Sequence, residues 1–228
     1  MPVDPNATAE ITAFRWVPDF AAGLVRDLRI RWALEEIEQS YRVRLLDATN
    51  PRPAEYFLEQ PFGQVPYYRD DQVQLFESGA ILLHLAIEDE RLLPFNRNQR
   101  MRSVAWMIAA LNSIEPIILQ LLAIDVFNRG QEWTKERRPQ VVEFLEARLG
   151  KLSDALGDKE WFEGRFTIGD LMVVAVLRQL RHTDIVAKFP NLAALVARAE
   201  ARPAFQRALA DQLAVFKEHQ PEPEGEAA

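Results

Sequence analysis

The chain has no cysteine. It can therefore form no disulfide, offers no thiolate nucleophile and cannot build a cysteine-based metal site. Histidine is also scarce, because only His84, His182 and His219 are present, far apart and in no spacing typical of metal ligands. We therefore expect no metal site, and any thiol that takes part in a reaction must come from a ligand.

An excess of positive charge is missing too. Lysine and arginine number 27 against 34 aspartates and glutamates, which gives a net charge of -7. Nucleic acids and anionic membranes repel such a protein. Lys135, Arg137 and Arg138 form a short basic cluster, for which a solvated helix start is the simpler interpretation.

Long apolar runs are absent as well. No stretch of roughly 18 apolar residues is uninterrupted, and the opening segment MPVDPNATAE lacks the basic start and apolar core of a signal peptide. These absences predict a cytoplasmic protein whose partner is a small molecule, with neither nucleic acid nor membrane as a partner.

The residues that are present predict two globular domains. The chain has 228 residues, of which 48% are hydrophobic and 27% charged. Alternating strand and helix periodicities predict the order β-α-β-α-β-β-α, with the first two strands parallel and the last two in a hairpin. We predict strands over residues 11–16, 41–46, 65–68 and 72–76, and helices over residues 30–37, 54–59 and 78–87.

From residue 98 onward the pattern is helical throughout. Residues 142–156 carry an apolar helical face, and residues 171–180 are apolar nearly all round, as in a buried central helix. The first predicted helical face consists of Met101, Val104, Ala105, Ile108 and Leu111. The predicted fold class is thus an α+β domain followed by an all-α domain.

These patterns divide the chain into five segments. They are a flexible N-terminus (1–10), the α+β domain (11–92), a linker (93–97), the all-helical domain (98–216) and a disordered tail (217–228).

Pro66 stands where the third strand begins. Proline cannot donate to a sheet ladder, so inside a fold it marks an edge, a strand start or a cis peptide bond. A simple strand start is one interpretation. The other is that the Val65–Pro66 peptide lines a binding site.

Glu77 and Ser78 stand where the fourth strand runs into a helix. The amides and the positive dipole end of a helix start attract a carboxylate, and the Glu77 side chain can pair with an ammonium group. The pair therefore has the chemistry to receive the α-carbon end of an amino acid. Helix capping by Ser78 is the alternative.

Together, these two motifs and the strand order resemble the glutathione transferase superfamily. The resemblance implies a thioredoxin-like first domain that binds glutathione as co-substrate. It implies that Pro66 is cis, that the main chain of Val65 meets the cysteinyl part of glutathione, and that Glu77 and Ser78 hold the γ-glutamyl end. Gln64 and Gln60 are further candidates for binding the glycyl carboxylate.

Thr167 and Asp170 have the spacing of a capping box, flanked by Phe166 and Leu171 as a hydrophobic staple. This motif is structural rather than catalytic. It also resembles the folding motif that begins the central helix in the second domain of the same superfamily, so the resemblance extends over residues 11–216.

The group that would ionise the thiol is missing. Most members use a tyrosine, serine or cysteine near the start of the first helix to lower the thiol pKa from about 8.5. Residues 15–33 contain none of the three. Aligning the end of that helix places the position near Val25 or Arg26, and Arg26, with the amides of the helix start, is our catalytic candidate. The alternative is that Arg26 pairs at the surface with Asp27, Glu35 or Glu36.

Four aromatic residues are candidates for the wall of a co-substrate pocket, although packing in a core is the alternative role of each. Trp16 and Phe20 lie in the loop after the first strand, and Trp106 and Phe127 lie in the helical domain.

The resemblance implies an enzyme of detoxification that transfers glutathione to an apolar electrophile and acts as a homodimer. Two alternatives remain open: a glutathione-dependent isomerase or peroxidase, and a non-catalytic binding or interaction protein on the same fold. The absence of cysteine counts against a disulfide reductase that uses its own side chain.

Overall fold

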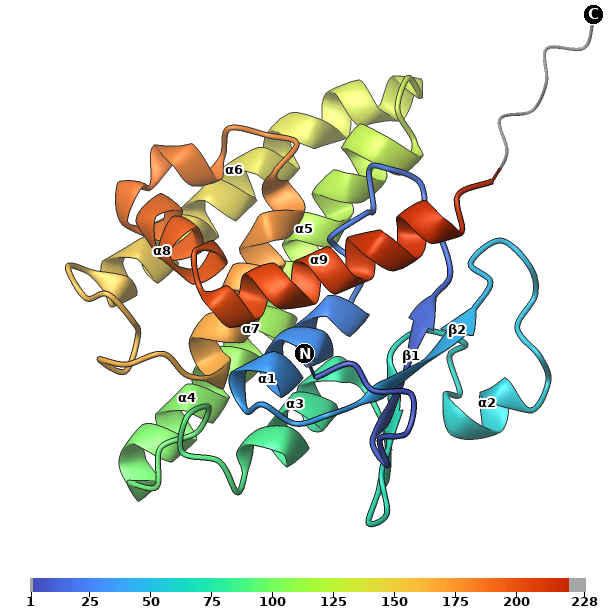
Figure 1. Cartoon of the computed structure of the whole chain (residues 1–228). Coiled ribbons are helices and arrows are strands. Elements are labelled where there is room, and N and C mark those ends of the chain that lie inside the picture. Colours follow the sequence, from blue (N-terminus) through green and yellow to red (C-terminus); the bar gives the residue numbers. More distant parts are fainter. Residues whose placement is uncertain (1, 222–228) are drawn as a thin grey trace, which may run out of the picture. The chain divides into compact units, whose positions relative to one another are not determined.

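A computed structural model describes residues 2–221 of the chain, and they form two compact units. One unit comprises the chain up to Ile81 and again from Ala204, and the other comprises Leu82–Pro203. The second unit thus begins within a helix, and the last helix belongs to the unit that holds the sheet (Figure 1). The sequence pattern instead predicts this division at residues 93–97 and the last helix in the helical domain.

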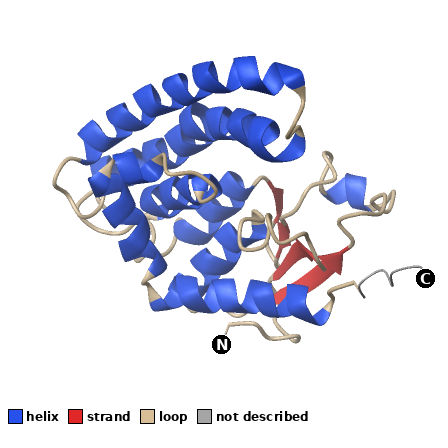
Figure 2. Cartoon of the chain, turned by 90° about the horizontal axis from the view of Figure 1, so that it is seen from above, coloured by secondary structure: helices blue, strands red, loops and turns tan. Residues whose placement is uncertain are grey.

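The sheet of the first unit has four strands in the order β2-β1-β3-β4. β1 and β2 are parallel, whereas β3 is antiparallel to both β1 and β4. The strands are red in Figure 2. The strands are β1 Glu10–Phe14, β2 Arg42–Leu46, β3 Tyr67–Arg69 and β4 Gln74–Phe76. The helices between them are α1 Asp27–Glu36, α2 Tyr56–Glu59 and α3 Ser78–Ala86. The predicted order β-α-β-α-β-β-α is confirmed.

The segment before β1 is held against β2. The N–H of Asp4 donates to the carbonyl of Tyr41 at 2.9 Å, and the N–H of Tyr41 donates to the carbonyl of Pro2 at 2.8 Å. Main-chain hydrogen bonds therefore hold residues 2–9 in place, whereas the sequence pattern predicts a flexible segment over residues 1–10. At the other end α9, Pro203–Glu218, continues into the segment predicted to be disordered, of which residues 222–228 lie outside the described residues.

Helix α1 is buried on nearly every side, although its sequence predicts a half-exposed helix. Residues 27–35 are all buried, charged ones included, and α9 lies along the helix (Figure 1). Arg31 Nε lies 2.8 Å from Asp27 Oδ2, and Gln212 of α9 donates to Asp27 Oδ1 at 2.8 Å. Arg207 of α9 donates to the buried Glu35 carboxylate at 2.5 Å. Partners from the end of the chain thus keep these charges paired, as burial requires.

Glu10 is the centre of a charged cluster on the sheet. Its carboxylate lies 2.9 Å from Arg42 Nε, 3.2 Å from Arg44 Nε and 3.0 Å from Arg69 Nε. Burial of the carboxyl group raises the pKa of Glu10, but the hydrogen bonds from Arg42 and Arg69 outweigh burial, so the pKa lies below its ordinary value. The cluster ties β1 to both of its neighbours.

Glu10→Gln is expected to lower the free energy of unfolding by about 1–2 kcal/mol at pH 7, because three guanidinium groups lose their shared anion. The stabilisation is present above the unfolded-state pKa of about 4.3 and is lost as pH falls through the lower folded-state pKa. Urea unfolding at pH 7 and at steps down to pH 3 measures the difference between parent and variant. A difference that does not shrink below about pH 4 would contradict this account. Glu132→Gln, which changes a carboxylate that is 86% exposed, is the control.

The second unit is helical in all of its regular structure among the described residues. Its helices are α4 Arg97–Ala109, α5 Glu115–Leu122, α6 Glu132–Leu156, α7 Ile168–Leu177 and α8 Pro190–Glu200. A π-helical segment, 110–114, joins α4 to α5, and a second, 123–127, extends α5, so that the helix is continuous up to Phe127. Pro116 follows the first of them, and because proline lacks an N–H, the wider π-turn accommodates the missing i to i-4 bond.

The continuous helix Arg97–Phe127 is long enough to span a membrane, and the mean hydropathy of its most apolar 18-residue window is 1.8. Core helices of soluble proteins have the same properties, and 44% of its most apolar window is buried within the protein. Length and composition alone are therefore weak evidence for a membrane role.

The buried face of α4 is not the predicted one. Ser103 and Met107 are buried, whereas Met101 is 58% exposed and Ile108 is 47% exposed. Gly169 of α7 explains why this face of α4 is the buried one. A Cβ at Gly169 would lie 2.8 Å from Trp106 Cβ and 2.9 Å from the Ser103 carbonyl oxygen. The glycine lets α4 and α7 approach closely along the Ser103 face, which leaves an apolar face uncovered in this chain.

The predicted capping box at the start of α7 is confirmed. Asp170 Oδ2 accepts hydrogen bonds from the Thr167 N–H and hydroxyl, each at 2.9 Å, and Oδ1 accepts from the Phe162 N–H at 2.9 Å. Phe166 and Leu171 are buried on either side of it. Asp170 therefore joins the helix start to the preceding loop.

Candidate active site

The sequence-predicted glutathione motifs meet at one edge of the sheet. In the β3–β4 hairpin Tyr67 is paired with Phe76, so that Pro66 and Glu77 lie next to each other just beyond that pair. Because β3 is antiparallel to β1, the loop that follows β1 leaves the sheet at the same edge. Three separate segments therefore converge at this edge of the sheet. They are the β1–α1 loop, the Val65–Pro66 peptide and the start of α3.

The Val65–Pro66 peptide bond is cis, as the resemblance implies. The side chain of Val65 is buried in a cluster with Leu46, Tyr56 and Tyr67. Among residues 2–221, no hydrogen bond engages the main-chain N–H or C=O of Val65. These groups are therefore available to an extended peptide ligand that lies alongside.

A chain of three hydrogen bonds holds this peptide in place. The Tyr67 N–H donates to Thr12 Oγ1 at 2.8 Å, Thr12 Oγ1 lies 2.8 Å from Tyr56 Oη, and Tyr56 Oη donates to the Gln64 carbonyl at 2.6 Å. Tyrosine has one hydroxyl proton and a carbonyl can only accept, so Thr12 must donate to Tyr56. Thr12 and Tyr56 were not singled out from sequence, because each lies far along the chain from the peptide that it supports.

Glu77 and Ser78 differ in exposure. Ser78, the first residue of α3, is 5% exposed, whereas the Glu77 side chain reaches solvent. Glu77 has φ of 71°, in the left-handed region that glycine tolerates and other residues rarely adopt. A non-glycine residue in this conformation costs about 1–2 kcal/mol.

Glu77→Gly is expected to leave the free energy of unfolding unchanged or raise it by about 0.5 kcal/mol, because relief of the left-handed conformation is offset by the backbone entropy of glycine. The KM for glutathione should rise about fivefold, because the ligand ammonium loses its carboxylate partner. Thermal unfolding and steady-state kinetics measure the two effects.

Glu38→Gly is the matched control, since Glu38 is also a glutamate with positive φ, 56°, and follows α1 away from the motif. It should reproduce the stability effect and leave the KM for glutathione unchanged. An equal rise of KM in both variants would remove Glu77 from the binding site.

The two glutamines proposed for the glycyl carboxylate have different positions. Gln60 is 2% exposed, and its Oε1 accepts the Phe62 N–H at 2.7 Å, which shapes the turn after α2. Gln64 is exposed and adjoins Val65. The geometry therefore favours Gln64 over Gln60 as the ligand contact.

Arg26 immediately precedes α1 and is half-buried. Two amides at this helix start are already engaged, because the Leu28 N–H donates to Val25 at 3.0 Å and the Arg29 N–H donates to Arg26 at 3.1 Å. Asp27 and Glu35, suggested as surface partners of Arg26, are instead buried and bound to α1 and α9 as described above. The amides of Leu28 and Arg29 therefore cannot assist Arg26 as the sequence prediction requires.

The four candidate aromatic residues have different surroundings. Trp16 is half-buried and Phe20 is 48% exposed in the β1–α1 loop. In the helical unit Trp106 stacks on Phe162 with ring centroids 4.3 Å apart and donates to Glu163 at 3.1 Å, as a packing residue does. Phe127 is 67% exposed.

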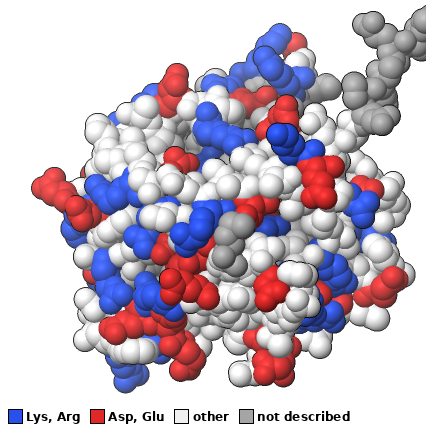
Figure 3. All heavy atoms as spheres, viewed as in Figure 1, with Lys and Arg blue, Asp and Glu red and all other residues white. Residues whose placement is uncertain are grey.

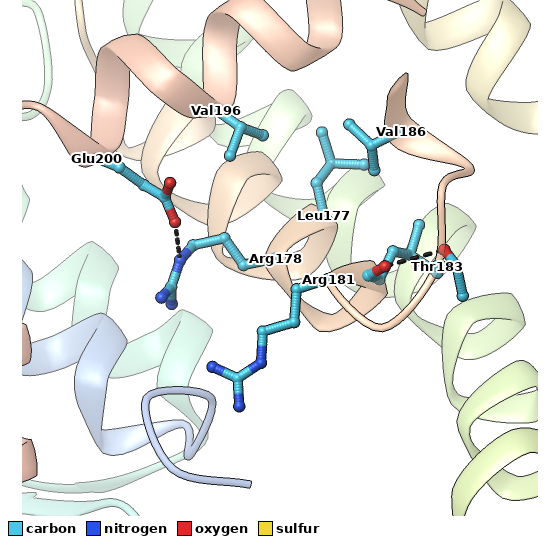
Figure 4. A pocket seen from close by; sticks show the side chains of 8 residues that line it. Leu177, Arg178, Arg181, Thr183, Val186, Val196 and Glu200 are labelled. Carbon is cyan, nitrogen blue, oxygen red and sulfur yellow. Dashed lines mark hydrogen bonds and ion pairs between the residues drawn. The ribbon is translucent and has the colours of Figure 1, made fainter. Parts of the chain in front are cut away.

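A cavity of about 160 Å³ lies within the helical unit and contains none of the predicted site residues. Leu177, Val186 and Val196 line one part of it, and Arg178 and Arg181 another (Figure 4). Arg178 Nε lies 2.6 Å from a Glu200 carboxylate oxygen, so its charge is balanced within the protein. Among residues 2–221, no group of three or more acidic, histidine or cysteine side chains is placed to hold a metal ion.

The basic cluster at the start of α6 is balanced by acidic neighbours. Lys135 Nζ lies 3.1 Å from Glu132, and Arg138 Nε lies 2.7 Å from Asp125. Acidic and basic side chains are interspersed on the face shown in Figure 3. Such a surface has none of the concentrated positive charge that nucleic-acid binding uses.

The fold is that of a thioredoxin-like domain followed by a helical domain. Residues 20–87 match the family described as Glutathione S-transferase, N-terminal domain, and residues 124–212 match Glutathione S-transferase, C-terminal domain. These matches fall within the predicted domains 11–92 and 98–216. The chain belongs to the glutathione transferase superfamily.

The chain is also similar in sequence to individual glutathione S-transferases. The chain is 29% identical over 178 residues to Glutathione S-transferase F14 of Arabidopsis thaliana, which covers 70% of this chain and 66% of that protein. It is 25% identical over 195 residues to Glutathione S-transferase 1 of Zea mays, which covers 80% of this chain and 90% of that protein.

Solved structures from bacteria are similar as well. A glutathione transferase from Burkholderia graminis, with two glutathione molecules bound per subunit, has 26% identity and a TM-score of 0.75, covering 88% of this chain and 87% of its own. A family member from Pseudomonas fluorescens, with two glutathione bound, has 24% identity and a TM-score of 0.77, covering 88% and 92%.

Proposed function

We propose that this protein is a glutathione transferase that attaches the glutathione thiol to an apolar electrophile. The observation that carries the proposal is the register of the β3–β4 hairpin, which places the cis Val65–Pro66 peptide beside Glu77 and Ser78. An exposed carboxylate, a buried hydroxyl at a helix start and an unused main-chain amide match the ammonium, carboxylate and cysteinyl amide of glutathione in charge and hydrogen bonding.

In this proposal each residue has one role. Glu77 accepts hydrogen bonds from the γ-glutamyl ammonium, and Ser78 donates to the neighbouring carboxylate. The main chain of Val65 pairs with the cysteinyl residue, and Gln64 binds the glycyl carboxylate. The thiol loses its proton to solvent, and its sulfur forms a bond to the electrophilic carbon as the leaving group departs with the bonding electrons.

Thiolate stabilisation remains assigned to Arg26, whose guanidinium cation can lower the pKa of an adjacent thiol. Trp16 and Phe20, in the same loop, are proposed to contact the electrophile. Replacing either aromatic residue should change the order of preference among electrophiles without loss of fold.

The experiment is an ultraviolet titration of the thiol of bound glutathione, combined with turnover of 1-chloro-2,4-dinitrobenzene. We expect a bound-thiol pKa clearly below about 8.5 and conjugate formation above the uncatalysed rate. Arg26→Ala should raise that pKa toward its solution value. Tight binding without a pKa shift or turnover would support a non-catalytic binding protein instead.

A second function, glutathione-dependent peroxide reduction, is favoured by the bacterial relatives that hold two glutathione molecules. Two bound thiols can together supply the two electrons that reduce a hydroperoxide to an alcohol and water, yielding glutathione disulfide. Cumene hydroperoxide as substrate, with glutathione disulfide as the measured product, separates this reaction from conjugation.

We also propose that the protein is a cytoplasmic homodimer. The sheet unit exposes Phe57, Leu58 and Phe62, the last two at 90% and 66%, and α4 exposes Met101 and Ile108. Apolar surface of this kind is typical of interfaces. Sedimentation as a monomer at micromolar concentration would contradict the dimer.

A further inference from the structure

Arg29 is a buried cation beside the proposed glutathione site. It lies in α1, is 3% exposed, and donates from its Nη1 to Ser78 Oγ at 3.2 Å. The two residues are separated by 49 positions in sequence, and Ser78 is itself 5% exposed. The contact therefore joins α1 to the first residue of α3 in a desolvated environment.

The direction of this hydrogen bond determines what Ser78 can do. A guanidinium group has only donors, so the serine oxygen must be the acceptor. The serine proton is then left to point toward an acceptor elsewhere. A carboxylate has only acceptors when ionised, and it is the ligand group that such a hydroxyl suits.

The positive charge of Arg29 also favours a carboxylate as the partner of Ser78. Its guanidinium contacts the hydroxyl at the start of α3, where the helix dipole is also positive. Both fields favour an anion over a neutral group of the same shape, and low exposure limits screening by solvent. An uncharged amide in place of the carboxylate would gain from neither field.

We infer that Arg29 is a positioning residue that makes Ser78 an obligate donor and thereby selects the α-carboxylate of the γ-glutamyl group. This inference rests on the proposed binding of that group by Ser78. Arg29 acts through Ser78 and the local field, and it makes the site specific for γ-glutamyl ligands that keep a free carboxylate.

The test compares two ligands, glutathione and its analogue in which the γ-glutamyl α-carboxylate is a primary amide. Isothermal titration gives the ratio of their dissociation constants for each variant. In the parent protein the ratio should favour glutathione strongly. In Arg29→Met we expect glutathione affinity to fall about tenfold while amide affinity changes little, so that the ratio falls by nearly the same factor. Arg29→Lys, which keeps the charge and a donor, should restore part of the ratio.

The control is Arg207→Met, which removes a guanidinium from a buried carboxylate in the same unit, away from Ser78. It should lower the melting temperature and leave the ligand ratio unchanged. An Arg29→Met protein that loses stability but keeps the parent ratio would overturn the inference. If Arg29→Met does not fold, Arg29→Gln, which removes the charge, takes its place, and a full parent ratio in that variant would likewise overturn the inference.

Ser78→Ala separates this inference from the function on which it rests. Loss of glutathione affinity in Ser78→Ala with an unchanged ratio in the Arg29 variants refutes only the role of Arg29. Unchanged affinity in Ser78→Ala refutes the assignment of the γ-glutamyl site itself.

Discussion

Ser78→Ala is expected to raise the KM for glutathione about 10- to 100-fold, with a smaller effect on kcat. The hydroxyl is buried at the start of α3, and a hydrogen bond from such a group to a charged carboxylate is worth about 1.5–3 kcal/mol. Each 1.4 kcal/mol corresponds to about tenfold in affinity. Steady-state kinetics at saturating electrophile, with glutathione varied, measure the change.

A second buried serine provides the matched control. Ser103 in α4 is fully buried and donates to the Gln99 carbonyl at 2.8 Å, so Ser103→Ala also deletes one buried hydroxyl. It should change folding stability by a similar amount and leave the KM for glutathione unaltered. If both serine variants shift KM equally, the effect comes from general loosening of the fold, and Ser78 has no specific role.

Asp170→Ala is expected to lower the free energy of unfolding by about 3–5 kcal/mol, the largest stability effect among these variants. It removes the acceptor of three hydrogen bonds, and each buried donor left without a partner costs about 1–3 kcal/mol. Burial raises the pKa of Asp170 to about 6, so the carboxylate is ionised at neutral pH and accepts from all three donors. A fall in melting temperature of roughly 10 °C should accompany the change.

Two variants define the role of the carboxylate. Asp170→Asn keeps one oxygen acceptor in the same shape and should show an intermediate loss. Asp154→Ala removes a carboxylate of α6 that is 74% exposed, and it should change stability by less than about 0.5 kcal/mol. Equal effects of Asp170→Ala and Asp154→Ala would show that the capping box contributes nothing beyond a surface charge.

Elements that depend on neighbours in sequence were predicted well. Alternation along residues 41–46 and 72–76, and the Thr167–Asp170 spacing, depend on contacts within a strand, a turn or one helical turn. The pairing of the glutathione motifs also followed from local chemistry, because a two-strand hairpin necessarily brings the residue before it beside the residue after it. The roles assigned to Val65, Pro66, Glu77 and Ser78 remain predictions.

The periodicity of the sequence did not predict that the charged residues of α1 are buried. Asp27, Arg31 and Glu35 are spaced like residues of a solvated face, yet all three are buried. Their partners include Arg207 and Gln212, near the opposite end of the chain. A helical pattern shows which residues share a face, but it cannot show which element will cover that face.

The sequence by itself determined the order of the elements, the parallel and antiparallel pairing, the capping box and the candidate ligand edge. Only the tertiary structure decided which face of α4 is buried, that α9 covers α1, and that Arg29 meets Ser78. The physical reason is range: backbone conformation and capping are governed by residues a few positions apart. Burial of a charge or choice of a helix face is governed by whichever distant surface packs there.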